Sequence, residues 1–358
     1  MFAYFGTYTR ETSQGIYRSD FDPEHGALTV PALAAKAASP TFLSTDSSSR
    51  FLYATGELLL DPSPKPALGG ATAYAIDRPS GGLRWLNQEA TGGGGTVHSQ
   101  VDTTTRALVI ANYHTGYVAA VPIGADGRVG PRSAYFPHEG VAPLGPNRTR
   151  QDRPHPHCII LSPDNRFAYS CDLGQDRIYC YRLDPAHATL QPNDPPFGIA
   201  EPGSGPRHGV FSPDGKYLYV ANELNGTVTL YRHDAPRGAL TLVQSYSTLP
   251  EGFSGENTVG EIDLHPNGKY LYVSNRGHDS IAVFARDPAS GRLERKEIVG
   301  CGGKHPRTFT VAPNGRWLLC GNKDTNSVVV FAVDPGTGRI TATGREVSVP
   351  EVVCVLIV

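Results

Sequence analysis

The chain has 358 residues, including 40 glycines and 30 prolines, and only 18% of its residues are charged. Glycine and proline together make up about a fifth of it, well above their usual share. This composition excludes a helical bundle, a coiled coil and an acidic disordered chain, and it predicts tight turns between buried strands. A formal net charge of −2 argues against a nucleic-acid partner. An acidic ligand would therefore need a local basic pocket.

The sequence also predicts where the protein works. It has no apolar run long enough to span a bilayer, and its first residues, MFAYFGTYTR, lack the features of a signal peptide. Its six cysteines show no CxxC spacing, which in a long chain is typical of reduced, mostly buried thiols. We therefore expect a cytoplasmic protein with no membrane partner.

One sequence unit recurs about every 50 residues along the chain. Each copy reads as a strand, a tight turn of the Pro-Asp/Asn-Gly type, a second strand rich in β-branched and aromatic residues, a polar loop and a third strand. A weaker fourth strand follows. In chain order the copies begin at Ser39, Thr96, Pro156, Pro206, Gly260 and His305. Four antiparallel strands per copy, without helical periodicity, predict an all-β propeller.

The two ends of the chain predict the remaining blade. The opening FAYFGTY matches WLLCGNK from Trp317, a second strand, and the ending PEVVCVLIV matches PRTFTVA from Pro306, a first strand. The last strand should therefore pair with the first and close the ring, which removes two exposed sheet edges. We predict seven blades in a single domain spanning residues 1–358.

Within each predicted hairpin, the start of the first strand and the end of the second lie at the same end of the blade. If these positions served only packing they should stay similar between copies, but they diverge into histidine, arginine, glutamate and lysine. The charged or aromatic members are His157, Arg207, Arg307, Tyr8, Glu57, Tyr113, Glu223, Arg276 and Lys323. Polar groups converging on one mouth of an apolar scaffold predict a ligand site. A salt bridge between Arg207 and Glu223 with no further role is the alternative.

Two further segments have more than one interpretation. His155 and His157 alternate along a strand, so both rings could ligate zinc, but no third ligand is evident; we favour a functional His157 with His155 supporting it. Residues 137–153 form a polar insertion that enters at the same face. They are either a lid or rim of the site or a solvated surface loop.

At these residues the sequence resembles the seven-bladed propeller lactonases, the bacterial 6-phosphogluconolactonase type related to fungal carboxymuconate-lactonizing enzymes. The resemblance covers essentially the whole chain and rests on several short motifs together: FGTYT, HEG, PHPH, DLGQDRI, GPRH, ANEL, SNRGHDSI and HPRTF. One departure is Gly56-Glu57, where members of the family often have Asn-Glu. The resemblance implies an enzyme without cofactor or metal that acts on a lactone or its open acid.

By motif, the resemblance places the catalytic residues at His157, Arg207, Glu223 and Arg276. Lactone hydrolysis needs a base for water and a positive group for the oxyanion. Either His157 or Glu223 is the base, and the arginines bind the anionic group and polarise the carbonyl. Arg307, Lys323 and Lys304 add positive charge. The predicted substrate-binding residues are His155, His98, Arg307 and Lys323.

Three functions remain open from the sequence. The first is hydrolysis of 6-phosphogluconolactone in the pentose phosphate route, with a small anionic lactone as the partner. The second is a lactonase or lactonizing enzyme for a muconate-type or unphosphorylated sugar lactone. The third is a non-catalytic interaction platform, which would be expected to carry aromatic and apolar residues on its loops in place of histidine, arginine and glutamate.

Overall fold

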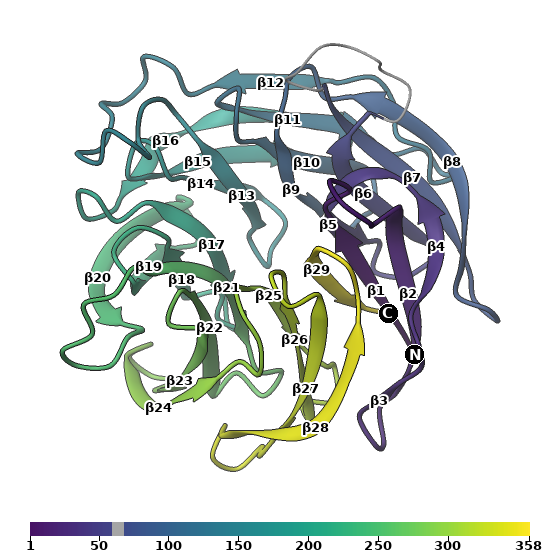
Figure 1. Cartoon of the computed structure of the whole chain (residues 1–358). Coiled ribbons are helices and arrows are strands. Elements are labelled where there is room, and N and C mark those ends of the chain that lie inside the picture. The colour runs from purple at the N-terminus through teal and green to yellow at the C-terminus, as the bar shows by residue number, and fades with distance from the viewer. Residues whose placement is uncertain (59–67) are drawn as a thin grey trace.

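The protein is an all-β ring of seven sheets, described here from a computed structural model over residues 1–58 and 68–358 (Figure 1). The described residues contain no α-helix. Each sheet is antiparallel, and in six of them strands adjacent in sequence pair as a meander; the seventh also joins the last strand to the first. The predicted seven-bladed propeller is therefore confirmed. No helix long and apolar enough to cross a membrane occurs in these ranges.

The first strand of each sheet contacts the first strands of both neighbouring sheets, so these seven strands surround the central channel. They are β29 (Val352–Ile357), β5 (Ala38–Thr45), β9 (Thr96–Val101), β13 (Pro156–Leu161), β17 (Pro206–Phe211), β21 (Thr258–Leu264) and β25 (Pro306–Val311). The second strands are β1 (Phe2–Thr7), β6 (Phe51–Glu57), β10 (Ala107–Asn112), β14 (Phe167–Asp172), β18 (Tyr217–Asn222), β22 (Tyr270–Arg276) and β26 (Trp317–Asn322).

The outer half of each blade consists of a third and a fourth strand. The third strands are β2 (Gly15–Asp22), β7 (Gly69–Asp77), β11 (Tyr117–Pro122), β15 (Arg177–Asp184), β19 (Thr227–Asp234), β23 (Ser280–Arg286) and β27 (Ser327–Val333). The fourth are β4 (Ala32–Lys36), β8 (Gly82–Ala90), β12 (Ala134–Pro137), β16 (Thr189–Ile199), β20 (Ala239–Ser247), β24 (Leu293–Gly300) and β28 (Ile340–Ser348). The first blade departs from four strands, because the short strand β3 (Ala27–Leu28) also pairs with β2.

The two ends of the chain share one blade, as predicted. Strand β29 pairs antiparallel with β1, with Tyr4 opposite Leu356 and Phe5 opposite Val355. The two termini therefore lie side by side in Figure 1. Closure between the first and last strands leaves no free inner edge at this blade, and opening the ring would break this ladder.

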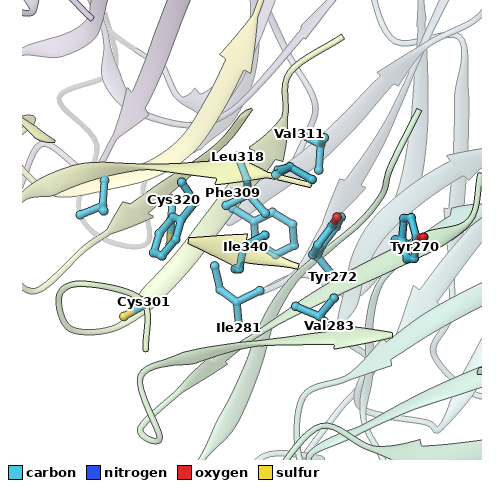
Figure 2. Packing of buried hydrophobic residues seen from close by; sticks show 13 residues of the cluster. Tyr270, Tyr272, Ile281, Val283, Cys301, Phe309, Val311, Leu318, Cys320 and Ile340 are labelled. Carbon is cyan, nitrogen blue, oxygen red and sulfur yellow. The ribbon is translucent and has the colours of Figure 1, made fainter. Parts of the chain in front are cut away.

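The hydrophobic core lies between blades. Figure 2 shows one interface, where Tyr272, Ile281 and Val283 of one blade lie beside Phe309 and Ile340 of the next. Alternating residues of the inner strands supply these apolar contacts on both faces of each sheet. The six cysteines are all buried and unpaired, as the sequence predicts for buried thiols.

In several blades, a tyrosine on the second strand forms a hydrogen bond to the next blade. In four blades its hydroxyl donates to the carbonyl of a turn glycine in the following blade. The pairs are Tyr4–Gly81 (2.7 Å), Tyr169–Gly238 (3.2 Å), Tyr219–Gly291 (2.7 Å) and Tyr272–Gly338 (2.9 Å). These bonds fix four of the blades against the blade that follows, and so they help to hold the channel residues in register.

Candidate functional site

A β-bulge places three of the predicted site residues. In β13, β17 and β25 the pairing with the second strand skips one residue, and the skipped residues are His157, Arg207 and Arg307. An extra residue in one strand redirects its side chain away from the regular alternation. The bulge therefore turns these side chains toward the mouth of the channel instead of into the packing between blades.

The carboxylate of Glu223 is the centre of a buried charged cluster at this mouth. Its Oε2 accepts from Arg207 Nε at 3.1 Å and lies 2.9 Å from Arg276 Nη2. His157 Nε2 is 3.8 Å from the same oxygen. Each of these four side chains has at most 7% of its surface exposed. The structure thus brings together all four residues that the sequence predicts as catalytic.

Main-chain carbonyls of β21 hold the two arginines from the other side. Arg207 Nη1 donates to Gly260 O and Arg276 Nη2 donates to Val259 O, each at 2.5 Å. Burial lowers the pKa of Arg207 to about 9, which leaves the guanidinium charged at neutral pH. Both guanidiniums are therefore fixed positive groups with little freedom to move.

The cluster keeps Glu223 ionised. Burial alone would raise the pKa of this carboxyl group, but Arg276, Arg207 and Arg150 outweigh burial and hold the pKa well below its ordinary value. A carboxylate with so low a pKa is a weak proton acceptor. Glu223 is therefore better suited to orient the arginines and His157 than to remove a proton from water.

His157, in contrast to Glu223, is uncharged. Burial, reinforced by Arg207, His208 and Arg307, lowers its pKa well below the ordinary value, so the ring is neutral at pH 7. Its Nδ1 is buried and has no hydrogen-bond partner among residues 1–58 and 68–358. The ring packs edge-on against Tyr113, with centroids 5.4 Å apart. A neutral imidazole with an unpartnered nitrogen can accept a proton from a water or a substrate hydroxyl.

The ring of His155 contacts Tyr113 and Asp152. Its ring stacks on Tyr113 with centroids 4.2 Å apart, Nδ1 lies 3.0 Å from Tyr113 O, and Nε2 lies 3.0 Å from Asp152 Oδ1. His155 precedes β13, and the bulge at His157 breaks the alternation that would put both rings on one face. Among the described residues, no group of three or more histidine, cysteine, aspartate or glutamate side chains could hold a metal ion.

His98 lies beside this cluster, in the channel. Its ring lies against that of Phe42, tilted by 30° with centroids 3.8 Å apart, and meets the ring of His208 edge-on at 5.1 Å. His208 in turn lies 5.1 Å from the ring of His157 and contacts Glu261 Oε1 through Nδ1 at 2.7 Å. Burial lowers the pKa of both His98 and His208 well below the ordinary value. Sequence reasoning quoted His208 within GPRH but assigned it no role.

The two remaining predicted binding residues flank the cluster without a direct contact to Glu223. The guanidinium of Arg307 lies over the ring of Tyr8, 5.5 Å from its centroid. Lys323 forms an ion pair with Asp324, and about a third of its side chain is exposed. Tyr8 also belongs to a cavity of about 840 Å³ at this mouth, lined in addition by Arg10, Thr41, Glu57 and His114 among others.

Most side chains of residues 137–153 are exposed, but the segment is anchored near each end, which favours a rim of the site over a free surface loop. The buried ring of His138 bonds Asp172 Oδ2 at 2.6 Å and Tyr181 OH at 2.7 Å, which docks the segment on its blade. At its far end Arg150 forms an ion pair with Glu223 Oε1 and a side-chain hydrogen bond with Tyr113. Sequence reasoning missed Arg150, because it stands outside the repeat and no internal copy exists to compare it with.

The fold and the site together define a seven-bladed β-propeller with a buried, net positive side-chain cluster at one mouth of its channel. The family model described as "Lactonase, 7-bladed beta-propeller" matches residues 2–357. The chain belongs to this family, which confirms the resemblance and, at the level of the family, the prediction of a lactone-hydrolase enzyme.

Named relatives agree with this assignment. A protein of Bacillus subtilis named 6-phosphogluconolactonase is 36% identical over 306 residues, 86% of this chain and 83% of its own. A 6-phosphogluconolactonase of Formosa agariphila is 29% identical over 312 residues, 86% and 85% of the two chains. The solved structure of a periplasmic gluconolactonase from Pseudomonas aeruginosa superimposes with a TM-score of 0.91 at 33% identity, covering 99% of this chain and 98% of that one.

Proposed function

We propose that this protein hydrolyses 6-phosphogluconolactone to 6-phosphogluconate at the Glu223 cluster. The observation that carries the proposal is the combination of three guanidiniums and a neutral histidine around one carboxylate, in a chain of the lactonase family. Positive charge in excess of negative charge favours an anionic substrate. Relatives named 6-phosphogluconolactonase support the choice of lactone.

In the proposed mechanism His157 is the general base. It takes a proton from water as the water oxygen attacks the lactone carbonyl, and Arg207 or Arg276 stabilises the negative charge that develops on the carbonyl oxygen. When the tetrahedral intermediate collapses, the bond to the ring oxygen breaks. The imidazolium of His157 returns its proton to that oxygen, which gives the open hydroxy acid. The base and the groups that stabilise the oxyanion in these steps are all side chains of the protein.

Glu223 has a supporting part in this mechanism. Its carboxylate holds Arg207 and Arg276 in place and, at 3.8 Å from His157 Nε2, favours the imidazolium that forms during the reaction. The depressed pKa of His157 in the free protein keeps the ring unprotonated at neutral pH, which is the form that a base requires. An anionic substrate would offset part of the arginine charge, which would bring this pKa back toward its ordinary range.

Hydrolysis of unphosphorylated gluconolactone is a second candidate, because the Pseudomonas aeruginosa protein of similar structure is named a gluconolactonase. That protein is periplasmic by its name, whereas we propose a cytoplasmic location for this chain on the basis of its six buried thiols. A place in the pentose phosphate route would follow from the phosphorylated substrate.

The deciding experiment compares two lactones with one purified protein. Enzymatically generated 6-phosphogluconolactone and gluconolactone are supplied to the wild type and to His157→Ala, and the spontaneous rate is subtracted. Faster hydrolysis of the phosphorylated lactone, lost in the variant, is the expected result. Preference for gluconolactone would favour the second candidate, and no acceleration of either lactone by the folded protein would contradict both.

A further inference from the structure

Arg150 differs from the other two arginines of the cluster in how it is held. Arg207 and Arg276 are buried, and each donates to a main-chain carbonyl of β21 as well as to Glu223. The Arg150 guanidinium instead contacts two side chains, Glu223 and Tyr113, and 36% of its side chain is exposed. Of the three guanidiniums, Arg150 is therefore the one that can leave Glu223 without breaking a bond to the main chain.

The backbone at Arg150 is fixed, whereas its guanidinium bonds only to side chains. The next residue, Gln151, is fully buried; its Nε2 donates to Leu173 O at 2.8 Å and its main-chain NH to Asn147 O at 2.7 Å. These bonds hold the end of the 137–153 segment against the blade of β13–β16. A rotation about the Arg150 side-chain bonds is thus enough to move the guanidinium, and no loop opening is required.

The balance of charge in the cluster also favours an exchange of Glu223 for another anion at Arg150. Three guanidiniums share one carboxylate: Arg207 and Arg276 occupy Oε2, and Arg150 occupies Oε1. If Arg150 turned away, Glu223 would keep two fixed cationic partners. A carboxylate or phosphate on an incoming molecule would meet a planar guanidinium able to bind two of its oxygens.

We propose that Arg150 binds the acidic group of the substrate, exchanging its contact with Glu223 for one with that group. The inference rests on the proposed lactonase function and narrows the substrate class to lactones with an acidic group away from the reacting carbonyl. Because the ion pair also covers Glu223 from the rim, the same movement uncovers the cluster when an anion arrives. Arg150 is in this way a specificity-determining residue that lies outside the repeated units of the fold.

The test measures binding of the open acids, which do not turn over. Calorimetry compares 6-phosphogluconate with gluconate, which lacks the phosphate, for the wild type, Arg150→Ala and Arg150→Lys. Arg148→Ala is the matched control, since Arg148 lies in the same segment and is exposed. Thermal melting of each variant checks that it is folded. The kcat/KM values for the two corresponding lactones are measured alongside.

Arg150→Ala is expected to weaken binding of 6-phosphogluconate about 10- to 100-fold and that of gluconate less than about threefold, with partial recovery in Arg150→Lys. Arg148→Ala should behave as the wild type. Equal losses of affinity for both acids would show that Arg150 only positions Glu223. An unchanged affinity of Arg150→Ala for 6-phosphogluconate would also overturn the proposal, and so would a wild type that does not bind this acid. Selective binding through Arg150 without hydrolysis of either lactone would refute the proposed function alone.

Discussion

Glu223 on the blade of β17–β20 and Arg276 on the next blade meet at 2.9 Å between Oε2 and Nη2, deep in the channel mouth. The ion pair crosses the boundary between two blades, and Arg276 also donates to Val259 O on β21. The proposed site and the packing between blades are therefore coupled at this position. A change at Glu223 should alter both activity and stability.

Glu223→Gln should show this double effect. The amide leaves three guanidiniums without their counter-charge, two of them buried, so we expect the free energy of unfolding to fall by about 3 kcal/mol. We expect kcat/KM for 6-phosphogluconolactone to fall about 100-fold because the arginines lose their orientation. Denaturant titration and initial rates measure the two effects.

Glu57→Gln is the matched control for that prediction. Glu57 occupies the equivalent position of another blade, and its carboxylate forms no ion pair within residues 1–58 and 68–358. This control should change stability by less than about 0.5 kcal/mol. A Glu223→Gln protein as stable as Glu57→Gln would contradict the account of Glu223 as the anchor of the arginines.

His157→Gln should lower kcat/KM by about 100-fold or more, because the amide cannot serve as a base. His155→Gln should cost less, because that ring supports Tyr113 and bonds Asp152 with both nitrogens already engaged. Steady-state kinetics with 6-phosphogluconolactone give both values. A larger loss of kcat/KM in His155→Gln than in His157→Gln would reverse their assigned roles and favour the alternative in which both rings bind zinc.

The pH dependence of kcat/KM follows from the lowered pKa of His157. The base works only when neutral, so activity is lost as the pH falls through its pKa in the free protein. Since that pKa lies well below the ordinary value of 6.5, activity should persist as the pH falls through 6.5 and decline only in more acidic solution. Rates from about pH 4.5 to 7.5 locate the decline. A midpoint above 6.5 would be incompatible with a buried base among arginines.

Tyr272→Phe tests the tyrosine bonds between blades. Removing the hydroxyl leaves Gly338 O without its donor, so we expect the free energy of unfolding to fall by about 1 to 2 kcal/mol. Tyr53 is equally buried, but its hydroxyl has no hydrogen-bond partner in the described part of the chain. Tyr53→Phe should therefore be close to neutral in the same denaturant titration, and equal losses in the two variants would argue against the bond to Gly338.

The sequence by itself determined the ring and most of its site. The repeats can be recognised in the sequence because every blade packs against its neighbours in the same way. Apolar alternation and turn glycines therefore recur in each copy. His157, Arg207, Glu223 and Arg276 were among the positions that depart from the repeated pattern, and the resemblance to the lactonase family singled out these four. The pairing of the first and last strands followed from the same comparison, because each terminus matched a different strand of the unit.

Tertiary structure decided the features that have no repeated counterpart. The bulge at His157 separates it from His155, which alternation along an ideal strand would have placed on the same face. Arg150 reaches Glu223 from an insertion that docks through His138. The two residues lie 73 positions apart in sequence, and no sequence pattern predicts their contact. Only the folded structure shows that Glu223 is a weak base and His157 a neutral one, because a pKa depends on the burial and the charges that the fold imposes on a group and not on its neighbours along the chain.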